Sequence, residues 1–314
     1  MRLSRRTLIQ SLSALLASCA GGLGWAAAAP KPLAFLATGD WGMNGDHFQR
    51  QVAAAMGVWA ERNDSRFVAA VGDNFYDAGV QSVSDPHWKR SFEDVYVATA
   101  LQTPWYAILG NHDYGGVPQA QIDYSATSKR WRMPARYYSR SMATPDGASV
   151  DLFFIDTSPM LTGYRERKED GPLRANVRAQ DPAAQRRWLD AALAGSKAGW
   201  KLVFGHHPVF SGGVHGDTSD LVATLRPMLE RHGVQAYICG HDHDLQHIER
   251  GGVTYVCTGA GATTRKVAGT AGSVFFSDKP GFTAYRLAAE RLDIDFVGVD
   301  GRFLHTARVP RLRS

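Results

Sequence analysis

Residues 234–247, VQAYICGHDHDLQH, place an apolar run directly before a cluster of histidines and aspartates. A short apolar run rich in aromatic and branched side chains predicts a buried strand. The run ends at Gly240, which lets the backbone turn sharply, and His241 and His243 follow at once. A strand of the core therefore ends directly in side chains that bind protons or metals.

The same order of apolar run, glycine and polar side chain occurs four more times. The other runs are LAFLATGDWG with Asp40, FVAAVGDNFYDAG with Asp73, WYAILGNHDY with Asn111, and KLVFGHHPVFSGG with His206. In open α/β sheets, ligand sites form beyond the carboxyl ends of the strands. We therefore expect the five turns to build one shared site.

The stretches between these runs favour an α/β architecture. Apolar residues recur at helical spacing in residues 46–62, 181–195 and 218–232, and Asp181-Pro182 is a good cap and first-turn pair. Strands that alternate with helices indicate an α/β fold. Residues 253–309 read instead as strands joined by hairpins, so we expect a second, largely antiparallel sheet packed on the first. Residues 163–181 and 259–273 are expected to be loops that influence substrate choice.

Composition excludes several classes of protein. The chain has 314 residues, of which 44% are hydrophobic and 21% are charged, so it can bury a large core. Three of its 35 basic residues lie in residues 1–29, which contain no acid, so the remainder carries 32 basic against 30 acidic residues. That balance gives no support to nucleic-acid binding. Cys239 and Cys257 lie in apolar runs and are expected to be buried thiols.

The amino terminus predicts export. Residues 1–29 combine basic residues, an apolar stretch and small residues before Pro30, which is typical of a signal peptide. Arg5-Arg6 resembles a twin-arginine signal, so the expected partner is the twin-arginine export machinery and the expected location is periplasmic or secreted. Cleavage before Pro30 would leave one catalytic domain, residues 30–314. A lipobox-like LLASC offers the alternative of a lipid anchor on Cys19.

The polar residues at and near the five turns are of types that commonly bind metal ions. The candidates are Asp40, Asp73, Tyr76, Asn111, His206, His241 and His243. Mixed nitrogen and oxygen donors suit iron, manganese or zinc. Seven groups exceed one tetrahedral zinc site but fit two metals that share a carboxylate. His241 and His243 point the same way in an extended segment, so Asp242 points elsewhere.

These motifs, in this order and spacing, resemble the metallophosphoesterase superfamily. GDWG, GDNFYDAGV, GNHDY, GHHPVFSGGVHG and GHDHDLQ are most similar to purple acid phosphatases of the tartrate-resistant type. The resemblance covers nearly the whole chain after residue 33. It implies a β-sandwich of two mixed sheets flanked by helices, in four αββα layers. It also implies hydrolysis of phosphate monoesters, of small molecules or proteins, by a hydroxide bound at a binuclear centre.

The resemblance also implies a role for each candidate. Asp73 would bridge both metals, and the family pattern places Fe(III) with Asp40, Tyr76 and His243. A divalent iron, zinc or manganese ion would bind Asn111, His206 and His241. Tyr76 discriminates most sharply, because a phenol with a pKa near 10 binds as phenolate at acid pH only to a strong Lewis acid.

Two further histidines match the family's substrate pocket. His112 and His215 are both candidates for the acid that protonates the leaving group, and Asp113 is a candidate to orient His112. His207 and Asp244 depart from the family pattern, and their roles stay open at this point.

Two other functions fit the same residues. One is a phosphodiesterase that uses two divalent metals, and the other is a non-catalytic envelope protein that binds metals or phosphorylated ligands. We expect a monomer, with membrane attachment only if Cys19 is lipidated.

Overall fold

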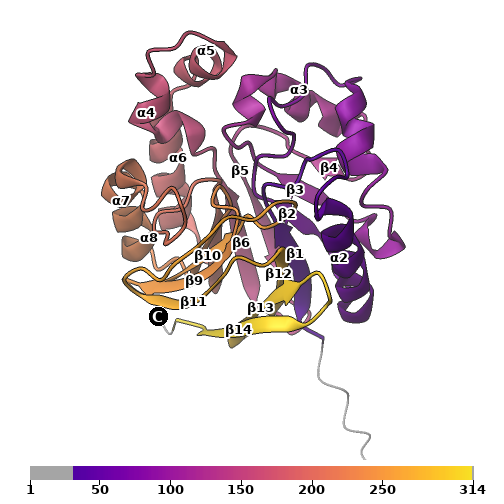
Figure 1. Ribbon diagram of the computed structural model, residues 1–314. Coiled ribbons are helices and arrows are strands. Elements are labelled where there is room, and N and C mark those ends of the chain that lie inside the picture. Colours follow the sequence, from indigo (N-terminus) through magenta and orange to yellow (C-terminus); the bar gives the residue numbers. More distant parts are fainter. Residues whose placement is uncertain (1–30, 313–314) are drawn as a thin grey trace, which may run out of the picture. The chain divides into compact units, whose positions relative to one another are not determined.

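A computed structural model describes residues 31–312, in which the strands form two seven-stranded sheets (Figure 1). The first sheet has the order β14-β13-β12-β1-β2-β3-β4, with β1 Leu33–Thr38, β2 Val68–Ala70, β3 Trp105–Ala107, β4 Trp131–Arg132, β12 Gly281–Leu287, β13 Arg291–Gly298 and β14 Phe303–Pro310. The second has the order β11-β9-β10-β8-β7-β6-β5, with β5 Tyr138–Ala143, β6 Ser149–Phe154, β7 Trp200–Phe204, β8 Ala236–Cys239, β9 Leu245–Arg250, β10 Val253–Thr258 and β11 Ser273–Ser277.

Helices lie on both outer sides of the sheets. They are α2 Gln49–Asn63, α3 Pro118–Asp123, α4 Thr162–Arg165, α5 Pro172–Arg178, α6 Pro182–Gly195, α7 Ser219–Thr224 and α8 Arg226–Arg231. Shorter turns are η1 Trp88–Glu93, η2 Thr99–Leu101, η3 Asp113–Gly115, η4 Tyr124–Ala126 and η5 Ser158–Met160. Figure 1 shows α2 and α3 on one side of the sheets and α4 to α8 on the other. The predicted sandwich of two mixed sheets with flanking helices is confirmed.

Both sheets have a parallel centre, and this centre positions the site. Strands β1 to β4 are parallel in the first sheet, and β6, β7, β8 and β10 are parallel in the second. Parallel neighbours end at the same edge of a sheet, so the turns that follow β1, β2 and β3 lie together, as do those that follow β7 and β8.

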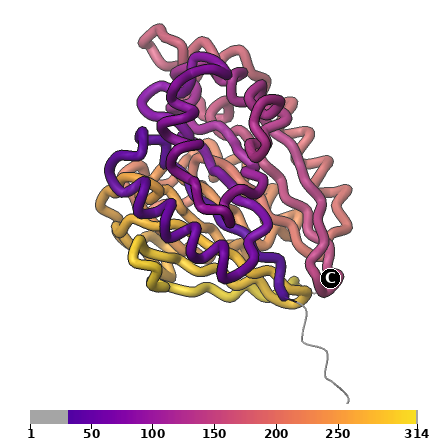
Figure 2. Tube along the Cα trace, turned by 90° about the vertical axis from the view of Figure 1, so that its right-hand side faces the viewer, coloured from indigo at the N-terminus to yellow at the C-terminus, as the bar shows by residue number. Residues whose placement is uncertain are grey.

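The prediction of a separate C-terminal sheet is wrong. β12, β13 and β14 join the first sheet through antiparallel pairing of β12 with β1, whereas β9, β10 and β11 join the second. The yellow C-terminal strands accordingly lie beside the indigo β1 in both views (Figures 1 and 2). Strand-like patterns identify strands but not their partners, because pairing is settled by contacts between segments far apart in sequence.

The side chains of the strands point alternately to the two faces of each sheet, and they form two hydrophobic cores. In β7, Leu202 and Phe204 face the core between the sheets, whereas Val203 faces the core under α6 to α8. Phe35 of β1 lies 6.4 Å from Phe204 between ring centroids, so the two sheets pack directly on one another. Because successive side chains of a strand point to opposite faces of the sheet, one strand contributes to both cores.

The predicted helices are found with different limits. Asp181 caps α6 by accepting hydrogen bonds from two backbone N–H groups of its first turn, as expected. The stretch 218–232 is two helices, α7 and α8, because Pro227 has no N–H and starts a new helix. In the stretch 46–62 the helix begins only at Gln49, and Phe48 is exposed.

The two predicted loops differ in outcome. Residues 163–181 contain helix α5 and most of α4, so the prediction of an unstructured loop there is wrong. Residues 259–272 are a loop that leads into β11. Cys239 and Cys257 are buried free thiols.

The proposed signal peptide of residues 1–29, including Cys19, lies outside the described residues. Within residues 31–312, no helix is both long and apolar enough for a membrane crossing.

Candidate metal centre

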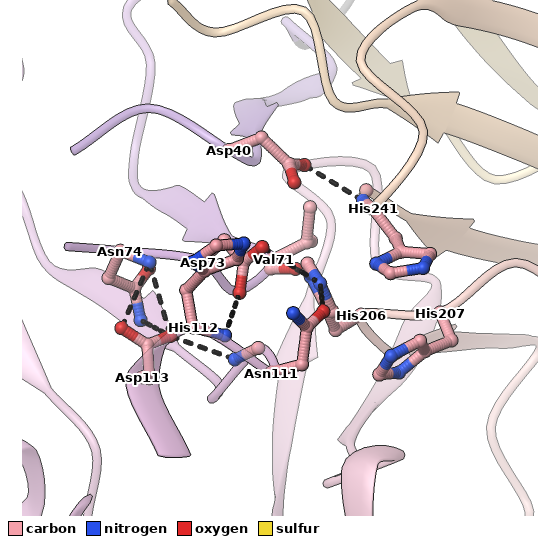
Figure 3. Close-up of polar contacts among 12 residues, drawn as sticks. Asp40, Val71, Asp73, Asn74, Asn111, His112, Asp113, His206, His207 and His241 are labelled. Carbon is pink, nitrogen blue, oxygen red and sulfur yellow. Dashed lines mark hydrogen bonds and ion pairs between the residues drawn. The ribbon is translucent and has the colours of Figure 1, made fainter. Parts of the chain in front are cut away.

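The five polar turns meet at the carboxyl ends of the two parallel centres. Asp40, Asp73 and Asn111 follow β1, β2 and β3 of the first sheet, and His206 and His241 follow β7 and β8 of the second (Figure 3). The N–H of Gly39 donates to the carbonyl of Thr258 at 2.9 Å and joins the sheets at this point.

Tyr76 is the meeting point of one half of the site. Its hydroxyl lies 3.0 Å from Asp40 Oδ1, 3.0 Å from Asp73 Oδ2 and 3.0 Å from His243 Nε2. The two carboxylates are fully buried. Four donor atoms of the predicted ferric site therefore converge on one point.

The other half gathers around His206. His206 Nε2 lies 3.4 Å from Asp73 Oδ2 and 3.2 Å from Asn111 Oδ1. The ring of His241 lies 5.2 Å from that of His206 between centroids. Asp73 thus faces both halves, as a bridging ligand must. All seven predicted ligands are brought together, and the roles assigned to them stay predictions.

Asp40 and Asp73 each use one carboxylate oxygen to bind a backbone N–H and direct the other toward the centre of the site. Asp40 Oδ2 accepts the N–H of His241 at 2.9 Å, and Asp73 Oδ1 accepts the N–H of His112 at 2.8 Å. The other oxygen of each residue faces Tyr76. These bonds hold neighbouring loops in place and leave one oxygen of each carboxylate directed at the centre.

Backbone geometry explains why glycines precede the ligands. A Cβ at Gly110 would lie 2.1 Å from Asp73 Oδ1, and one at Gly240 would lie 2.3 Å from Asp40 Oδ2. The ligands Asp40, Asp73 and His241 themselves have positive φ angles of 58°, 49° and 71°. Non-glycine residues adopt this region at an energetic cost, and such strain concentrates at functional sites.

The histidines are oriented as metal ligands usually are. His206 Nδ1 lies 3.0 Å from the carbonyl of Val71, which only accepts, so Nδ1 carries the proton and Nε2 is free to face the centre. His243 Nδ1 contacts Thr263 Oγ1 at 2.6 Å, which leaves its Nε2 on Tyr76. A second hydrogen bond that fixes the ring is typical of metal-bound histidine.

Without metals, the buried acidic groups of the site lack enough positive partners. Their pKa values therefore test whether the residues fit bound cations. Burial, with the neighbouring Asp73, raises the pKa of Asp40 well above its usual value. Burial and the two carboxylates raise the pKa of Tyr76 likewise. Burial by itself would raise the pKa of Asp73, but His206, His112 and His241 together outweigh it and hold that pKa low. Crowded buried acids call for added cations, so the residues fit a pair of metals.

Two more acids hold the surrounding loops. Asp113 accepts hydrogen bonds from the N–H groups of Asn74 and Gly110, so it ties two ligand turns together (Figure 3). It does not contact the His112 ring, so the proposed orienting role is wrong. The carbonyl of Asp77 occupies that place, 2.5 Å from His112 Nδ1. Asp242 points away from its flanking histidines, as predicted, and accepts the N–H of His215 at 3.1 Å.

His207 and Asp244 are buried beside the site. His207 Nδ1 contacts Thr157 Oγ1 at 2.8 Å, and its Nε2 contacts the Tyr164 hydroxyl at 3.1 Å. Burial and the adjacent His206 lower its pKa, so it is a neutral wall residue. Asp244 accepts from Gln246, and burial raises its pKa to about 7.

A cavity of about 580 Å³ opens beside His241. It is lined by His207 and His215 from the second sheet's loops, Tyr164 and Arg167 from the α4 region, and Asp217 and Asp220 near α7. No sequence pattern points to Tyr164, Thr157 or Thr263, because their partners are distant in the chain.

The sequence profile of the family described as calcineurin-like phosphoesterase matches residues 33–245. The chain belongs to the calcineurin-like phosphoesterase family. It is 36% identical over 307 residues to tartrate-resistant acid phosphatase type 5 of Oryctolagus cuniculus, covering 92% of this chain and 94% of that protein. It is 38% identical over 291 residues to purple acid phosphatase 7 of Arabidopsis thaliana, covering 89% and 86%.

Solved structures share the fold of this calcineurin-like phosphoesterase. GAP50, the anchor in the inner membrane complex of Plasmodium, superposes with a TM-score of 0.76 at 24% identity, over 90% of each chain. The purple acid phosphatase PPD1 of Lupinus luteus gives 0.64 at 14% identity, over 90% of this chain and 54% of that one. With the family match, the phosphatase relatives and the Asp and His clusters, the chain is a metal-dependent phosphoesterase with a candidate binuclear site.

A buried acid next to the centre gives a testable pH effect. Asp156 follows β6. Its Oδ2 accepts a hydrogen bond from the Tyr114 hydroxyl, and its Oδ1 has no hydrogen-bond partner among the described residues. Burial raises its pKa to about 7. The folded protein therefore binds this proton more tightly than the unfolded chain. Stability from it is present below about pH 4 and is lost as the pH rises through about 7.

We expect Asp156→Asn to remove this pH dependence. The free energy of unfolding of the variant relative to the wild type should rise by roughly 2–3 kcal/mol between pH 5 and pH 8. Urea unfolding of both proteins at the two pH values measures the difference. Curves that stay parallel from pH 5 to 8 would show that Asp156 is ionised in the folded state.

Proposed function

We propose that the chain is an exported acid phosphatase that hydrolyses phosphate monoesters at a mixed Fe(III)–divalent centre. The observation that supports this most strongly is the placement of the Tyr76 hydroxyl within 3.0 Å of Asp40, Asp73 and His243. A phenol among buried carboxylates loses its proton only to a strongly polarising cation, and Fe(III) is one.

Asp73 would be shared between the metals. Asp40, Tyr76 and His243 would complete the ferric side. Asn111, His206 and His241 would hold iron, zinc or manganese as a divalent ion. When bound, the pair supplies charge neutralisation for the phosphate oxygens and lowers the pKa of coordinated water.

His112 is the better placed proton donor. The carbonyl of Asp77 accepts from its Nδ1, which leaves Nε2 free to carry the proton that the leaving oxygen needs when the P–O bond breaks. His215 Nε2 instead lies 2.9 Å from a nitrogen of the Arg265 guanidinium, which only donates. His215 therefore has a lone pair at Nε2 and would orient the phosphate through Nδ1.

Export is supported by the sequence of residues 1–29, with Arg5-Arg6 as its centre. We propose a periplasmic or secreted monomer delivered by the twin-arginine machinery, with lipid attachment at Cys19 as the alternative. Accumulation of the Arg5→Lys/Arg6→Lys chain in the cytoplasm, detected by cell fractionation, is the expected result. Unchanged export of that chain would contradict this route.

The chemistry is tested by metal analysis, a visible spectrum and matched substrates. We expect iron with a second metal, a phenolate-to-iron absorption band that Tyr76→Phe removes, and faster hydrolysis of nitrophenyl phosphate than of bis(nitrophenyl) phosphate. A colourless protein active only on the diester would indicate a phosphodiesterase with two divalent metals. Two bound metals without turnover of either ester from pH 4 to 8 would indicate a binding protein.

A further inference from the structure

Arg265 lies in the loop between β10 and β11, and that loop is fixed at two points. The N–H of Arg265 donates to the carbonyl of His243 at 2.8 Å. The N–H of Ala268 donates to the carbonyl of Gly212 at 3.0 Å, in the loop that carries His215. The loop is therefore attached both to a ligand turn and to the substrate-pocket loop.

The Arg265 guanidinium is largely uncommitted. One of its nitrogens donates to His215 Nε2 at 2.9 Å. Among residues 31–312, no carboxylate lies within ion-pair distance of it, whereas its neighbour Lys266 pairs with Asp278 at 2.7 Å. Its remaining N–H groups face solvent beside the centre.

Other charges near the cavity are already engaged. Arg167 pairs with Glu169 at 2.5 Å, Asp217 accepts the N–H of Ser211 at 2.9 Å, and Asp220 accepts the N–H of Thr162 at 2.7 Å. Among the described residues, Arg265 is thus a cation without an ion-pair partner beside the candidate metal centre.

The position of Arg265 next to His215 indicates which kind of anionic group it could bind. The His215 ring lies 4.3 Å from that of His241 between centroids, and Arg265 contacts the Nε2 atom of His215. The guanidinium therefore extends the row of side chains that begins at His241 and continues through His215. A guanidinium there is suited to a carboxylate or a second phosphate, which it binds in a planar, two-pronged manner.

We propose that Arg265, supported by His215, binds a second, non-reacting anionic group of the substrate. This inference rests on the proposed phosphatase function. It makes the preferred substrates small phosphate monoesters whose leaving group carries a carboxylate or a further phosphate close to the scissile bond.

Phosphoglycolate and ethyl phosphate test the inference, because both have two-carbon leaving groups and only the first has a carboxylate. Arg265→Gln should lower kcat/KM for phosphoglycolate about tenfold, mainly through KM, and change ethyl phosphate less than about twofold. Arg265→Lys should restore part of the loss. Lys266→Gln removes the same charge from the same loop and should leave both substrates unchanged.

The outcomes separate this inference from the proposed function. Equal losses on both substrates in Arg265→Gln, with metal content unchanged, would overturn it by showing that Arg265 acts on the reacting phosphate. No loss on either substrate would overturn it as well. A wild-type protein that hydrolyses neither ester would overturn the phosphatase proposal itself.

Discussion

Asp73→Ala is expected to lose both metals and, with them, turnover by at least about 10³-fold. Asp73 Oδ2 is the atom that faces Tyr76 on one side and His206 on the other, so its removal takes a ligand from each metal. Metal binding to the folded state alone adds stability, about 4 kcal/mol at a thousandfold excess over Kd. The variant should therefore unfold at about the same temperature as the wild type from which the metals have been removed. Metal content per chain and thermal unfolding measure both effects.

Asp295→Ala is the matched control. Asp295 is also a buried acid, but it lies on β13 and accepts hydrogen bonds from Arg286 and Thr306. This variant should be less stable yet keep both metals. Asp73→Ala with two metals per chain would show that Asp73 does not bridge them.

His112→Ala should separate catalysis from metal binding. The His112 side chain is outside the proposed ligand set, and its Nε2 is free, so the variant should keep both metals. Loss of a general acid typically costs 10²–10⁴-fold, here roughly that much in kcat for an alkyl phosphate. Nitrophenyl phosphate should lose less than about tenfold, because nitrophenolate departs without a proton.

His305→Ala provides the comparison, since His305 lies on β14 and contacts His247 rather than the centre. It should leave both substrates unaffected. If His112→Ala reduced the two ester types equally, His112 would be a binding residue, and the proton would come from another group.

The sequence predicted which turns come together better than it predicted the sheets. The seven candidate ligands were identifiable because each follows an apolar run, and parallel strands bring such turns together regardless of what lies between them. The placement of β12 in the first sheet was not predictable in that way. It depends on the pairing of Leu287 with Leu33, residues at opposite ends of the domain.

Residues that act through distant partners were also missed. Arg265 sits in a glycine-containing loop with no periodic pattern, and only the folded chain brings it to His215. The sequence suggests Asp113 as a partner for its neighbour His112, yet its carboxylate accepts the backbone N–H of Asn74. Sequence proximity does not show where a side chain points.

Anomalous diffraction from crystals of the purified protein would show whether these strand ends enclose two cations. Two peaks about 3.5–4 Å apart are expected. One should be an iron among Asp40, Asp73, Tyr76 and His243, and the other a metal among Asp73, Asn111, His206 and His241. A single peak, or peaks away from Asp73, would contradict a binuclear centre at these strand ends.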